Sequence, residues 1–536
     1  MSSKNNLVLY EIYPRSFQDS NGDGYGDLKG IVSRLDYLQD LGINAIWITP
    51  FYPSPMKDGG YDIQDYCDVS SEFGTLDDFE KLVSAAHDRG IQIVIDLVVN
   101  HTSDQHPWFK ESRASLDNPK RDWYIWKDPV DGKEPNNWMS VFEPTPWAFD
   151  EKTGQYYFHS FLTSQPDLNW ANPEVMEAVK EVIRFWIGKG VDGFRLDAAN
   201  YLWKDPRYLD EPDDPTYVEG QIQPFYKKLH IYMRDQLKTF EIIEELGKYI
   251  KEQSADGFLV TEAYLNKKGT DAIPVYKQYY ENISSGNVIP FNFELQRIPW
   301  SASSYRQFVT MYIKSLTPKE LPTFVFGNHD KPRVATRFGR EQAKIAAVLL
   351  LTLPGIPVIY YGEELGMEDV HIPDNMIHDT KAYTSPGFGR DPVRTPMQWD
   401  TSEQAGFTSG TPWLPLEDTW KDRNVSVQNQ NDHSMLHLYK KLLTMRKEDQ
   451  FLRDGAYDEV SVNNDAVFAY SRTVDGKGLL VLLNFSDSTQ VCTTPSSVGE
   501  CMVTSQTDIT EIKNNSEVVL KPYEACVLQW DGFNSR

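Results

Sequence analysis

The sequence predicts an α/β fold: a (β/α)8 TIM barrel with an inserted small domain after strand 3 and a C-terminal antiparallel β-sandwich domain. Three observations predict this fold. Eight short apolar runs alternate with amphipathic segments, as parallel strands and their crossover helices would. The alternation is interrupted once, after the third apolar run. Near Asp454 the helical pattern stops and alternating strands follow.

The eight apolar runs are the predicted barrel strands. Most are nearly all apolar and end in polar residues, which is typical of parallel strands buried on both faces. They span residues 7–17, 43–50, 92–101, 193–199, 258–264, 289–295, 322–328 and 357–365. Eight strand–helix units favour a closed barrel.

Helices are predicted between these strands from their periodicity and end signals. The first, at 28–42, ends at Gly42. The second, at 75–90, begins with Thr75 followed by acidic residues, a typical helix start. Further helices are predicted at 173–190 and 434–448.

Three segments fall outside this alternation. Residues 102–170 are rich in Trp, Pro, Asn and Asp and lack a clear period, which predicts the inserted domain. Residues 366–433 are polar and rich in Gly and Pro, and no fold is predicted for them. We therefore divide the chain into the barrel (1–101 and 171–454), the inserted domain (102–170) and the C-terminal β domain (455–536).

Composition excludes several classes of partner. The 536 residues include 53 Lys and Arg against 78 Asp and Glu, a formal charge of −25, so nucleic acid and anionic membrane surfaces are not expected partners. No stretch of 18 apolar residues occurs and the start lacks a signal-peptide pattern, so we expect a cytoplasmic protein. Four cysteines are too few for a disulfide scaffold, although one bridge among the three near the C-terminus stays open.

Polar residues recur where the predicted strands end, which is where barrel enzymes place their chemistry. Asn100-His101, Arg195 with Asp197, Glu262 and Asn328-His329-Asp330 hold these positions. Arg195 and Asp197 are two residues apart and share a strand face, so we expect the guanidinium to lower the pKa of the Asp197 carboxylate. Two carboxyl groups about 5–5.5 Å apart would suit retaining glycoside hydrolysis.

The motifs themselves resemble the α-amylase family, glycoside hydrolase family 13, and within it the α-glucosidase and oligo-1,6-glucosidase branch. They are DLVVNH at 96–101, GFRLD at 193–197, TEAY at 261–264 and FGNHD at 326–330. A fifth, QPDLN, lies at 165–169. The resemblance begins at YEIYPRSF (10–17) and continues into the C-terminal β domain.

The resemblance implies a role for each matching residue. Asp197 would be the nucleophile, Glu262 the general acid/base and Asp330 the third acid that binds sugar hydroxyls. Arg195 would orient the nucleophile, and Asp62 with Arg394 would close the pocket behind the non-reducing end, which makes cleavage exo. The remaining residues that the family implies at the bound glucose are Tyr61 (stacked under the ring), His101, His329, Phe142, Phe161 and Gln165.

An Asp-rich loop spaces oxygen ligands in the manner of the first part of an EF-hand. The side chains of Asp19, Asn21, Asp23 and Asp27 and the carbonyl of Tyr25 are the predicted ligands of one structural Ca2+. Position 12 of that pattern is Gly30 instead of glutamate, so a complete EF-hand is not expected. A metal-free Gly/Asp turn stays open as the alternative. No organic cofactor is predicted.

The predicted function is an exo-acting retaining α-glucosidase that acts on small α-glucosides as a monomer or homodimer. In the family branch, oligo-1,6-glucosidases tend to carry Val after the nucleophile, whereas this chain has Ala198-Ala199. That difference, together with a resemblance of TEAY and the residues around Asp330 to animal-type maltases, favours maltose-type or short oligosaccharide substrates, with sucrose as a further candidate. Two alternatives stay open. One is a glucosyl-transferring or isomerising enzyme of the sucrose isomerase or trehalose synthase type, and the other is a non-catalytic heavy-chain partner of amino-acid transporters.

Overall fold

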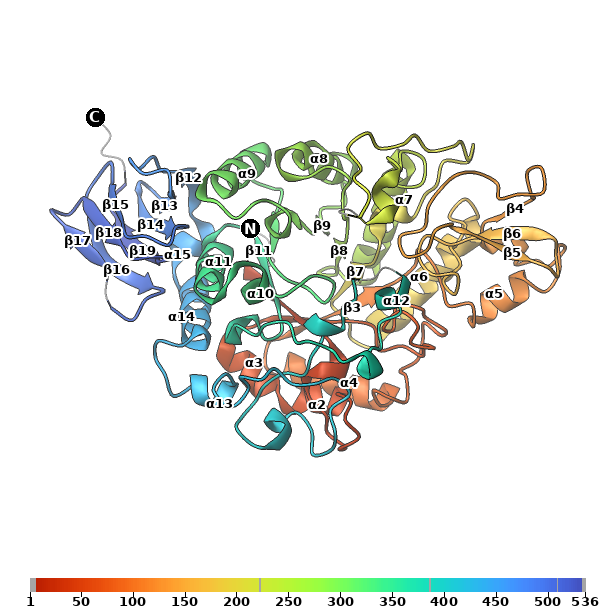
Figure 1. Cartoon of the computed structure of the whole chain (residues 1–536), viewed down its shortest axis with the longest axis horizontal. Coiled ribbons are helices and arrows are strands. Elements are labelled where there is room, and N and C mark those ends of the chain that lie inside the picture. The colour runs from red at the N-terminus through yellow and green to blue at the C-terminus, as the bar shows by residue number, and fades with distance from the viewer. Residues whose placement is uncertain (1–5, 221–222, 385–386, 509, 533–536) are drawn as a thin grey trace.

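The structure, a computed structural model, describes residues 6–220, 223–384, 387–508 and 510–532. Its centre is an eight-stranded parallel sheet with the order β10-β11-β1-β2-β3-β7-β8-β9 (Figure 1). The strands are β1 (Leu9–Ile12), β2 (Ala45–Ile48), β3 (Gln92–Leu97), β7 (Gly193–Leu196), β8 (Phe258–Thr261), β9 (Val288–Pro290), β10 (Thr323–Val325) and β11 (Ile356–Tyr360). All eight predicted barrel strands are therefore confirmed.

The two ends of this strand order, β9 and β10, are joined by the side chain of Thr323. Its hydroxyl donates to the carbonyl of Pro290 at 2.8 Å and accepts from the amide of Asn292 at 2.9 Å. This one side chain bridges the seam and brings the sheet close to a complete barrel.

Helices surround the barrel on its outer face (Figure 1). The main ones are α2 (Leu28–Ser33), α3 (Leu35–Leu41), α4 (Leu76–His87), α6 (Pro173–Gly188), α7 (Leu237–Gln253), α8 (Ile273–Asn282), α9 (Ala302–Ser315), α10 (Val334–Phe338), α11 (Arg340–Thr352) and α14 (Met435–Glu448). α4 starts with a full capping box, in which Thr75 and Asp78 each accept from the other's amide. Short 3-10 turns occur at η3 (Ala199–Tyr201), η5 (Gly269–Ala272), η6 (Glu294–Gln296) and η7 (Glu363–Leu365).

Two predicted elements differ from the structure. The helix expected over 28–42 is broken at Arg34, whose φ of −111° and ψ of 5° separate α2 from α3. The strand expected over 7–17 ends at Ile12, because Pro14 starts the short helix α1 (Pro14–Phe17). Proline fits the first turn of a helix, where its missing N–H costs nothing.

The inserted segment after β3 forms a small antiparallel sheet beside one end of the barrel. It contains α5 (Pro107–Ser112), η2 (Arg121–Trp123), β4 (Trp126–Lys127), β5 (Trp147–Asp150) and β6 (Gln155–Phe158), with strand order β4-β6-β5. His101 and Asp167 pair where the segment leaves and rejoins the barrel. The domain boundaries at 101/102, 170/171 and 454/455 stay predictions.

The segment after β11, for which no fold was predicted, is built from short turns: η8 (Asp374–Met376), α12 (Lys381–Thr384), η9 (Asp391–Val393), η10 (Glu403–Gly406) and α13 (Val425–Gln428). It is hydrogen-bonded to the residues that follow β1. The amide of Met397 donates to the carbonyl of Ser16 at 2.8 Å, and the Trp399 indole donates to the carbonyl of Phe17 at 2.8 Å. The segment therefore reaches the carboxyl end of β1.

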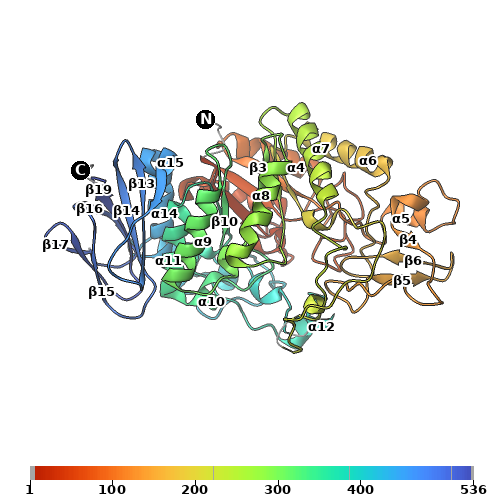
Figure 2. The same ribbon diagram turned by 90° about the horizontal axis from the view of Figure 1, so that it is seen from above.

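The C-terminal β domain consists of two sheets, ordered β12-β13-β14-β19-β16 and β15-β18-β17, after the short helix α15 (Gln450–Asp454). The strands are β12 (Ala456–Glu459), β13 (Val467–Val474), β14 (Lys477–Asn484), β15 (Gln490–Thr493), β16 (Val498–Thr504), β17 (Glu511–Lys513), β18 (Glu517–Leu520) and β19 (Ala525–Trp530). Figure 2 shows this domain and the inserted segment at opposite ends of the barrel.

All four cysteines of the chain are free thiols, so the bridge left open near the C-terminus is not formed. In the described part of the chain, no helix combines the length and apolar character needed to cross a membrane.

Candidate active site

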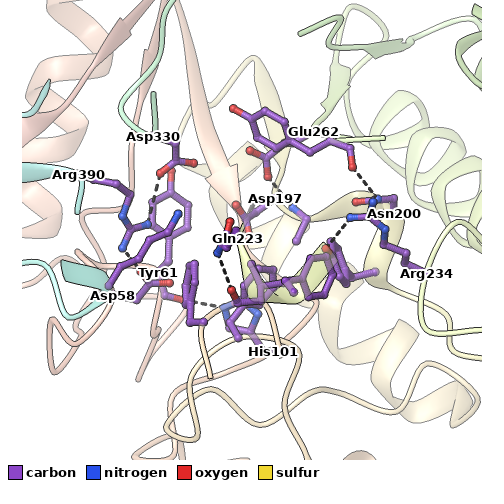
Figure 3. A pocket seen from close by; sticks show the side chains of 18 of the residues that line it. Asp58, Tyr61, His101, Asp197, Asn200, Gln223, Arg234, Glu262, Asp330 and Arg390 are labelled. Carbon is purple, nitrogen blue, oxygen red and sulfur yellow. Dashed lines mark hydrogen bonds and ion pairs between the residues drawn. The ribbon is translucent and has the colours of Figure 1, made fainter. Parts of the chain in front are cut away.

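A cavity of about 850 Å3 opens at the carboxyl ends of the barrel strands. Of the twelve residues predicted for catalysis and substrate binding, eight line it: Tyr61, His101, Phe142, Phe161, Asp197, Glu262, His329 and Asp330. The other four are Arg195, Gln165, Asp62 and Arg394. Residues from three strand ends, the loop after β2 and the inserted segment thus meet at one place (Figure 3).

Arg195 lies beneath the cavity and connects three carboxylates. Its Nη1 is 2.5 Å from Asp96 Oδ1 and 2.7 Å from Asp197 Oδ1, and its Nη2 is 2.5 Å from Glu262 Oε1. The register explains this arrangement, because Arg195 on β7 faces Asp96 on β3 and Val260 on β8. The guanidinium is fully buried and has no other charged partner among these strands.

The pKa of Asp197 is raised well above its ordinary value, because burial outweighs the attraction of Arg195. Arg195 lowers this pKa, as the sequence led us to expect, but the larger effect of burial sets the net direction. The pKa of Glu262 is also raised, chiefly by burial and further by Asp330. Three carboxylates around one guanidinium leave excess negative charge, so the cluster favours retaining a proton. Retaining hydrolysis uses such a pair with one carboxyl group protonated and the other ionised.

The backbone just after Asp197 adopts a conformation unusual for a residue with a side chain. Ala198 has φ 46° and ψ 38°, in the left-handed region. In this position its amide donates to Glu262 Oε2 at 3.0 Å. The turn thus holds Glu262 beside Asp197, and the two carboxyl groups hydrogen-bond to each other. Strained backbone of this kind clusters at active sites.

Asp330 differs from the other two acids in its electrostatic environment. Burial opposes its ionisation, but the guanidinium groups of Arg390 and Arg394 hold its pKa well below the ordinary value. Nη1 of Arg390 and Nη2 of Arg394 are each 3.3 Å from Asp330 Oδ1. Asp330 is thus a fixed negative charge facing the cavity.

The Tyr61 ring and the side chains of His101 and His329 line one part of the cavity. The Tyr61 ring stacks on His329 with centroids 5.3 Å apart and an 11° angle. The buried Tyr61 hydroxyl has no hydrogen-bond partner among the described residues, which leaves it available to a ligand. Burial lowers the pKa values of both histidines, that of His329 to about 3, so both are neutral. Nδ1 of His329 lies 2.5 Å from the buried carboxyl of Glu11.

Phe142, Phe161 and Gln165 come from the inserted segment. The two phenylalanine rings lie 5.5 Å apart, and both border the cavity. Gln165 lies just behind the wall, where its side-chain amide contacts His101 Nε2 at 3.1 Å and donates to Asp58 Oδ2 at 2.9 Å. The structure therefore places all three at the site, with Gln165 behind the lining.

The structure places Asp62 and Arg394, the expected pair at the end of the pocket, behind the residues that line the cavity. Asp62 is fully buried, and its carboxylate accepts from the Ser54 hydroxyl and from the amides of Lys57 and Asp58, each at 3.0 Å. Asp62 therefore holds its own loop together and does not border the cavity. Arg394 donates to the carbonyl of His329 at 3.0 Å and supports Asp330 from behind.

The ion pair that borders the cavity is formed by Asp58 and Arg390, two residues that the sequence reasoning missed. Nη2 of Arg390 is 2.6 Å from Asp58 Oδ1 and 2.7 Å from Asp379 Oδ1. The turn after Asp58 requires glycine, because Gly59 has φ +60° and a Cβ there would come within 2.8 Å of Arg394 Nη1. In the sequence, the short spacing from Asp58 to the predicted site residue Tyr61 could have marked Asp58. Arg390 lies in the segment 366–433, for which no fold was predicted.

Other residues of the lining are also absent from the sequence-based set. They are Val141, Ala198, Asn200, Tyr201, Gln223, Phe225, Tyr226, Arg234, Tyr264, Lys331 and Lys381. Many come from the long connection between β7 and α7, which includes η4 (Pro224–Lys227). Of these, only Tyr264, in the TEAY motif, and Ala198, after the predicted nucleophile, lay in segments that the sequence analysis singled out.

The Asp-rich loop is hydrogen-bonded within itself. Asp19 accepts from the amides of Asn21, Gly22 and Gly24 at 2.8–2.9 Å and from the Thr408 hydroxyl. The Thr408 hydrogen bond and then these amides lower its pKa against the effect of burial. Asp27 accepts from the amide of Gly30 at 2.7 Å and thereby caps α2. Among the described residues, no three His, Cys, Asp or Glu side chains are placed to hold a metal ion. Calcium at Asp19, Asn21, Asp23, Tyr25 and Asp27 stays a prediction.

Comparison with known proteins agrees with this geometry. Residues 11–455 match the family model for the alpha amylase catalytic domain. The oligo-1,6-glucosidase of Parageobacillus thermoglucosidasius is 39% identical over 97% of each chain, and the alpha-glucosidase of Apis mellifera is 37% identical over 96% of this chain and 92% of its own.

Two solved structures are also similar to this chain over nearly its whole length. The alpha-glucosyl transfer enzyme XgtA superposes with a TM-score of 0.90 at 36% identity, covering 99% of this chain and 100% of XgtA. The trehalulose synthase MutB from Pseudomonas mesoacidophila MX-45 gives 0.87 at 33% identity, covering 98% and 99%. The barrel, the acids at its strand ends and these matches together show that the chain belongs to the α-amylase family, glycoside hydrolase family 13.

Proposed function

We propose that the protein is an exo-acting retaining α-glucosidase that releases α-glucose from the non-reducing end of small α-glucosides. One observation carries the proposal: Arg195 contacts both Asp197 and Glu262 beneath the cavity that these two acids and Asp330 line. The names of the relatives, oligo-1,6-glucosidase and alpha-glucosidase, support the same activity.

The first half of the reaction follows from the two coupled acids. Glu262 gives its proton to the glycosidic oxygen while Asp197 attacks the anomeric carbon, so the leaving group departs as an alcohol and a β-glucosyl ester forms. Burial favours the protonated form of Glu262, and Arg195 holds Asp197 in position for attack. Negative charge from Asp330 favours the positively charged, oxocarbenium-like transition state.

In the second half, water enters from the side of the departed group. Glu262, now ionised, takes a proton from that water, and the hydroxyl attacks the anomeric carbon to displace Asp197. Two inversions release glucose as the α-anomer. The Asp58–Arg390 pair supports exo cleavage, because it adds two buried charged side chains to the lining beside Asp330, where they can bind the hydroxyls of a terminal glucose.

The proposal is tested with 4-nitrophenyl α-glucoside and with anomeric analysis by NMR. Wild-type protein is expected to release α-glucose first, and Asp197→Ala is expected to lose hydrolysis by at least about a thousandfold. Undiminished hydrolysis by Asp197→Ala, or initial β-glucose, contradicts the assignment.

A second candidate function is glucosyl transfer or isomerisation by the same covalent intermediate. The observation in its favour is the close superposition on XgtA, titled an alpha-glucosyl transfer enzyme, and on a trehalulose synthase. The two activities differ only in whether water or a sugar hydroxyl attacks the β-glucosyl ester. Incubation with sucrose and with maltose, followed by product identification, separates free glucose from isomers and longer glucosides.

Three further properties are proposed with the function. A Ca2+ ion at the loop 19–27 is supported by the hard oxygen donors there, none of which pairs with Lys or Arg in the described structure. A cytoplasmic location is supported by the four free thiols. We also propose that the protein acts on maltose-type substrates as a monomer or homodimer.

A further inference from the structure

The charged residues around the cavity are unevenly paired. Each of the four acids that line it has an arginine partner: Asp58 with Arg390, Asp197 and Glu262 with Arg195, and Asp330 with Arg390 and Arg394. Lys331 and Lys381 line the same cavity, yet within the described ranges neither ammonium has a carboxylate within 4.0 Å or a hydrogen-bond acceptor. Two cations of the lining therefore form no direct ion pair in the described part of the chain.

Both lysines lie against aromatic rings of the cavity wall. Lys331 directly follows Asp330, and its Nζ is 5.1 Å from the centroid of the Tyr264 ring. Lys381 begins α12, and its Nζ is 5.1 Å from the centroid of the Phe142 ring. Tyr264 and Phe142 also line the cavity. A ring face attracts a cation only weakly compared with a carboxylate or phosphate partner.

The surroundings of Lys381 make its positive charge costly. Burial, followed by the charges of Arg390 and Lys331, lowers the pKa of Lys381 to about 7. The acids near it, Asp330 and Asp379, already form ion pairs with Arg390. A desolvated cation without a partner is unfavourable, and a negatively charged ligand would remove that cost. The neutral hydroxyls of a simple oligosaccharide would not remove that cost.

The two lysines are also exceptional for the chain as a whole. With 53 basic against 78 acidic residues, the protein carries a formal charge of −25. The two lysines at the cavity are therefore not simply part of a generally basic surface. Such local fields of opposite sign attract charged ligands.

We propose that the part of the cavity outside the glucose site binds an acidic group, a carboxylate or a phosphate, carried by the leaving group of the substrate and contacted by Lys331 and Lys381. The inference rests on the proposed α-glucosidase function and names its substrate class as α-glucosides of acidic aglycones. The acidic group belongs on the aglycone because the closed end of the cavity presents Asp58 and Asp330, whose charges would repel an anion on the glucose.

The experiment compares substrates of equal shape and different charge. 4-Carboxyphenyl α-glucoside is measured against the neutral 4-carbamoylphenyl α-glucoside, and sucrose phosphorylated on its fructose unit against sucrose. We expect kcat/KM to favour at least one anionic member by about 10- to 100-fold, the worth of one or two charge-assisted hydrogen bonds. The carboxylate pair and the phosphate pair distinguish which acid the site takes.

Variants assign the preference to the two lysines. Lys331→Met and Lys381→Met keep the side-chain stem but remove the charge, and the double variant is expected to bring the anionic-to-neutral ratio close to one. Because Lys381 also lies in the field of Asp330, the readout is the ratio of kcat/KM between the anionic and the neutral member of each pair, which cancels a general loss of activity. Lys381→Arg should retain most of the preference, and Lys152→Met, at an exposed position in the turn after β5, serves as the matched control.

Inhibition by benzoate gives a second, independent measurement. Because Lys381 loses its proton as pH rises through about 7, the inhibition constant of benzoate should rise over that range in wild-type protein and not in Lys381→Met. The groups facing Lys381 that share the field are Arg390, Lys331, Asp330 and Asp379.

The outcomes separate this inference from the proposed function. Normal hydrolysis of the neutral substrates with no anionic preference, or a preference that the double variant keeps, overturns the acidic-aglycone site alone. Failure to hydrolyse any α-glucoside overturns the proposed function as well.

Discussion

The carboxylate of Asp58 lies 2.6 Å from Nη2 of Arg390, an ion pair that joins the loop after β2 to the segment after β11 across 332 residues of sequence. Both side chains are only 6% exposed. Arg390 also contacts Asp379 and Asp330, so this guanidinium connects the closed end of the cavity to the third acid.

Asp58→Asn is expected to weaken substrate binding more than folding. The amide keeps the size of the side chain but removes the charge that Arg390 and a sugar hydroxyl would share. We expect kcat/KM for maltose to fall by about 10- to 100-fold, mostly through KM. Steady-state kinetics with maltose checks this.

Asp62→Asn is the matched control, because Asp62 lies in the same loop with its carboxylate directed at Ser54 and two backbone amides. This variant is expected to lower Tm while kcat/KM changes by no more than about threefold. If Asp62→Asn raises KM and Asp58→Asn does not, Asp62 binds the substrate, as the family resemblance implies, and Asp58 does not.

This contrast shows where sequence reasoning about the site ends. Asp197, Glu262 and Asp330 could be placed because barrel chemistry lies at strand ends, and strand ends are visible as polar residues after apolar runs. Asp58 and Asp62 belong to one loop with no period. Only the fold shows that the oxygens of Asp62 are consumed by that loop, which leaves Asp58 to face the cavity.

The same limit applies to the fold. The barrel strands could be predicted because burial on both faces leaves a nearly continuous apolar run. The segment 366–433 has no such pattern, since its position depends on tertiary hydrogen bonds such as that from Met397 to Ser16. Arg390 and Lys381 lie in this segment and line the cavity, so these two site residues were the hardest to predict.

The raised pKa of Glu262 predicts the alkaline side of the pH profile. Glu262 must carry a proton to start the reaction, so kcat/KM should fall as pH rises through the folded-state pKa, which burial places above the ordinary glutamate range. In Glu262→Gln this alkaline limb should disappear. The same variant should reduce kcat/KM for maltose by more than that for 4-nitrophenyl α-glucoside, whose leaving group needs no proton. An unchanged alkaline limb in Glu262→Gln contradicts the role.

A buried acid away from the catalytic pair predicts how stability depends on pH. Burial raises the pKa of Glu363 from 4.5 to about 8, and neither carboxyl oxygen has a hydrogen-bond partner among the described residues. The folded state therefore binds this proton more tightly than the unfolded state. The contribution to stability is complete below pH 4.5 and decreases by about 1.4 kcal/mol per pH unit until pH reaches about 8.

Glu363→Gln should remove that decrease, because the amide has no proton to lose. Thermal unfolding measured from pH 5 to pH 9 should show a flatter profile and a higher Tm than wild type at pH 8. Glu448→Gln, at an exposed position of α14, is the control and should follow the wild-type curve. A steeper loss in Glu363→Gln would mean that the carboxyl group is ionised in the folded protein.

The proposed calcium ion is tested by metal removal. If the oxygens at 19–27 bind Ca2+ in the folded state only, adding the ion to chelator-treated protein should raise Tm by a few degrees, in proportion to the logarithm of its concentration. Asp23→Ala should abolish this rise, because Asp23 holds only neighbours in the loop, the amide of Tyr25 at 2.9 Å and the side chain of Asn21 at 3.0 Å. Asp256→Ala, at an exposed position before β8, should respond like wild type. A Tm that is independent of calcium in wild type would identify the loop as a metal-free turn. The hydrogen bonds to Asp19 and Asp27 would then fix the start of α2 without an ion.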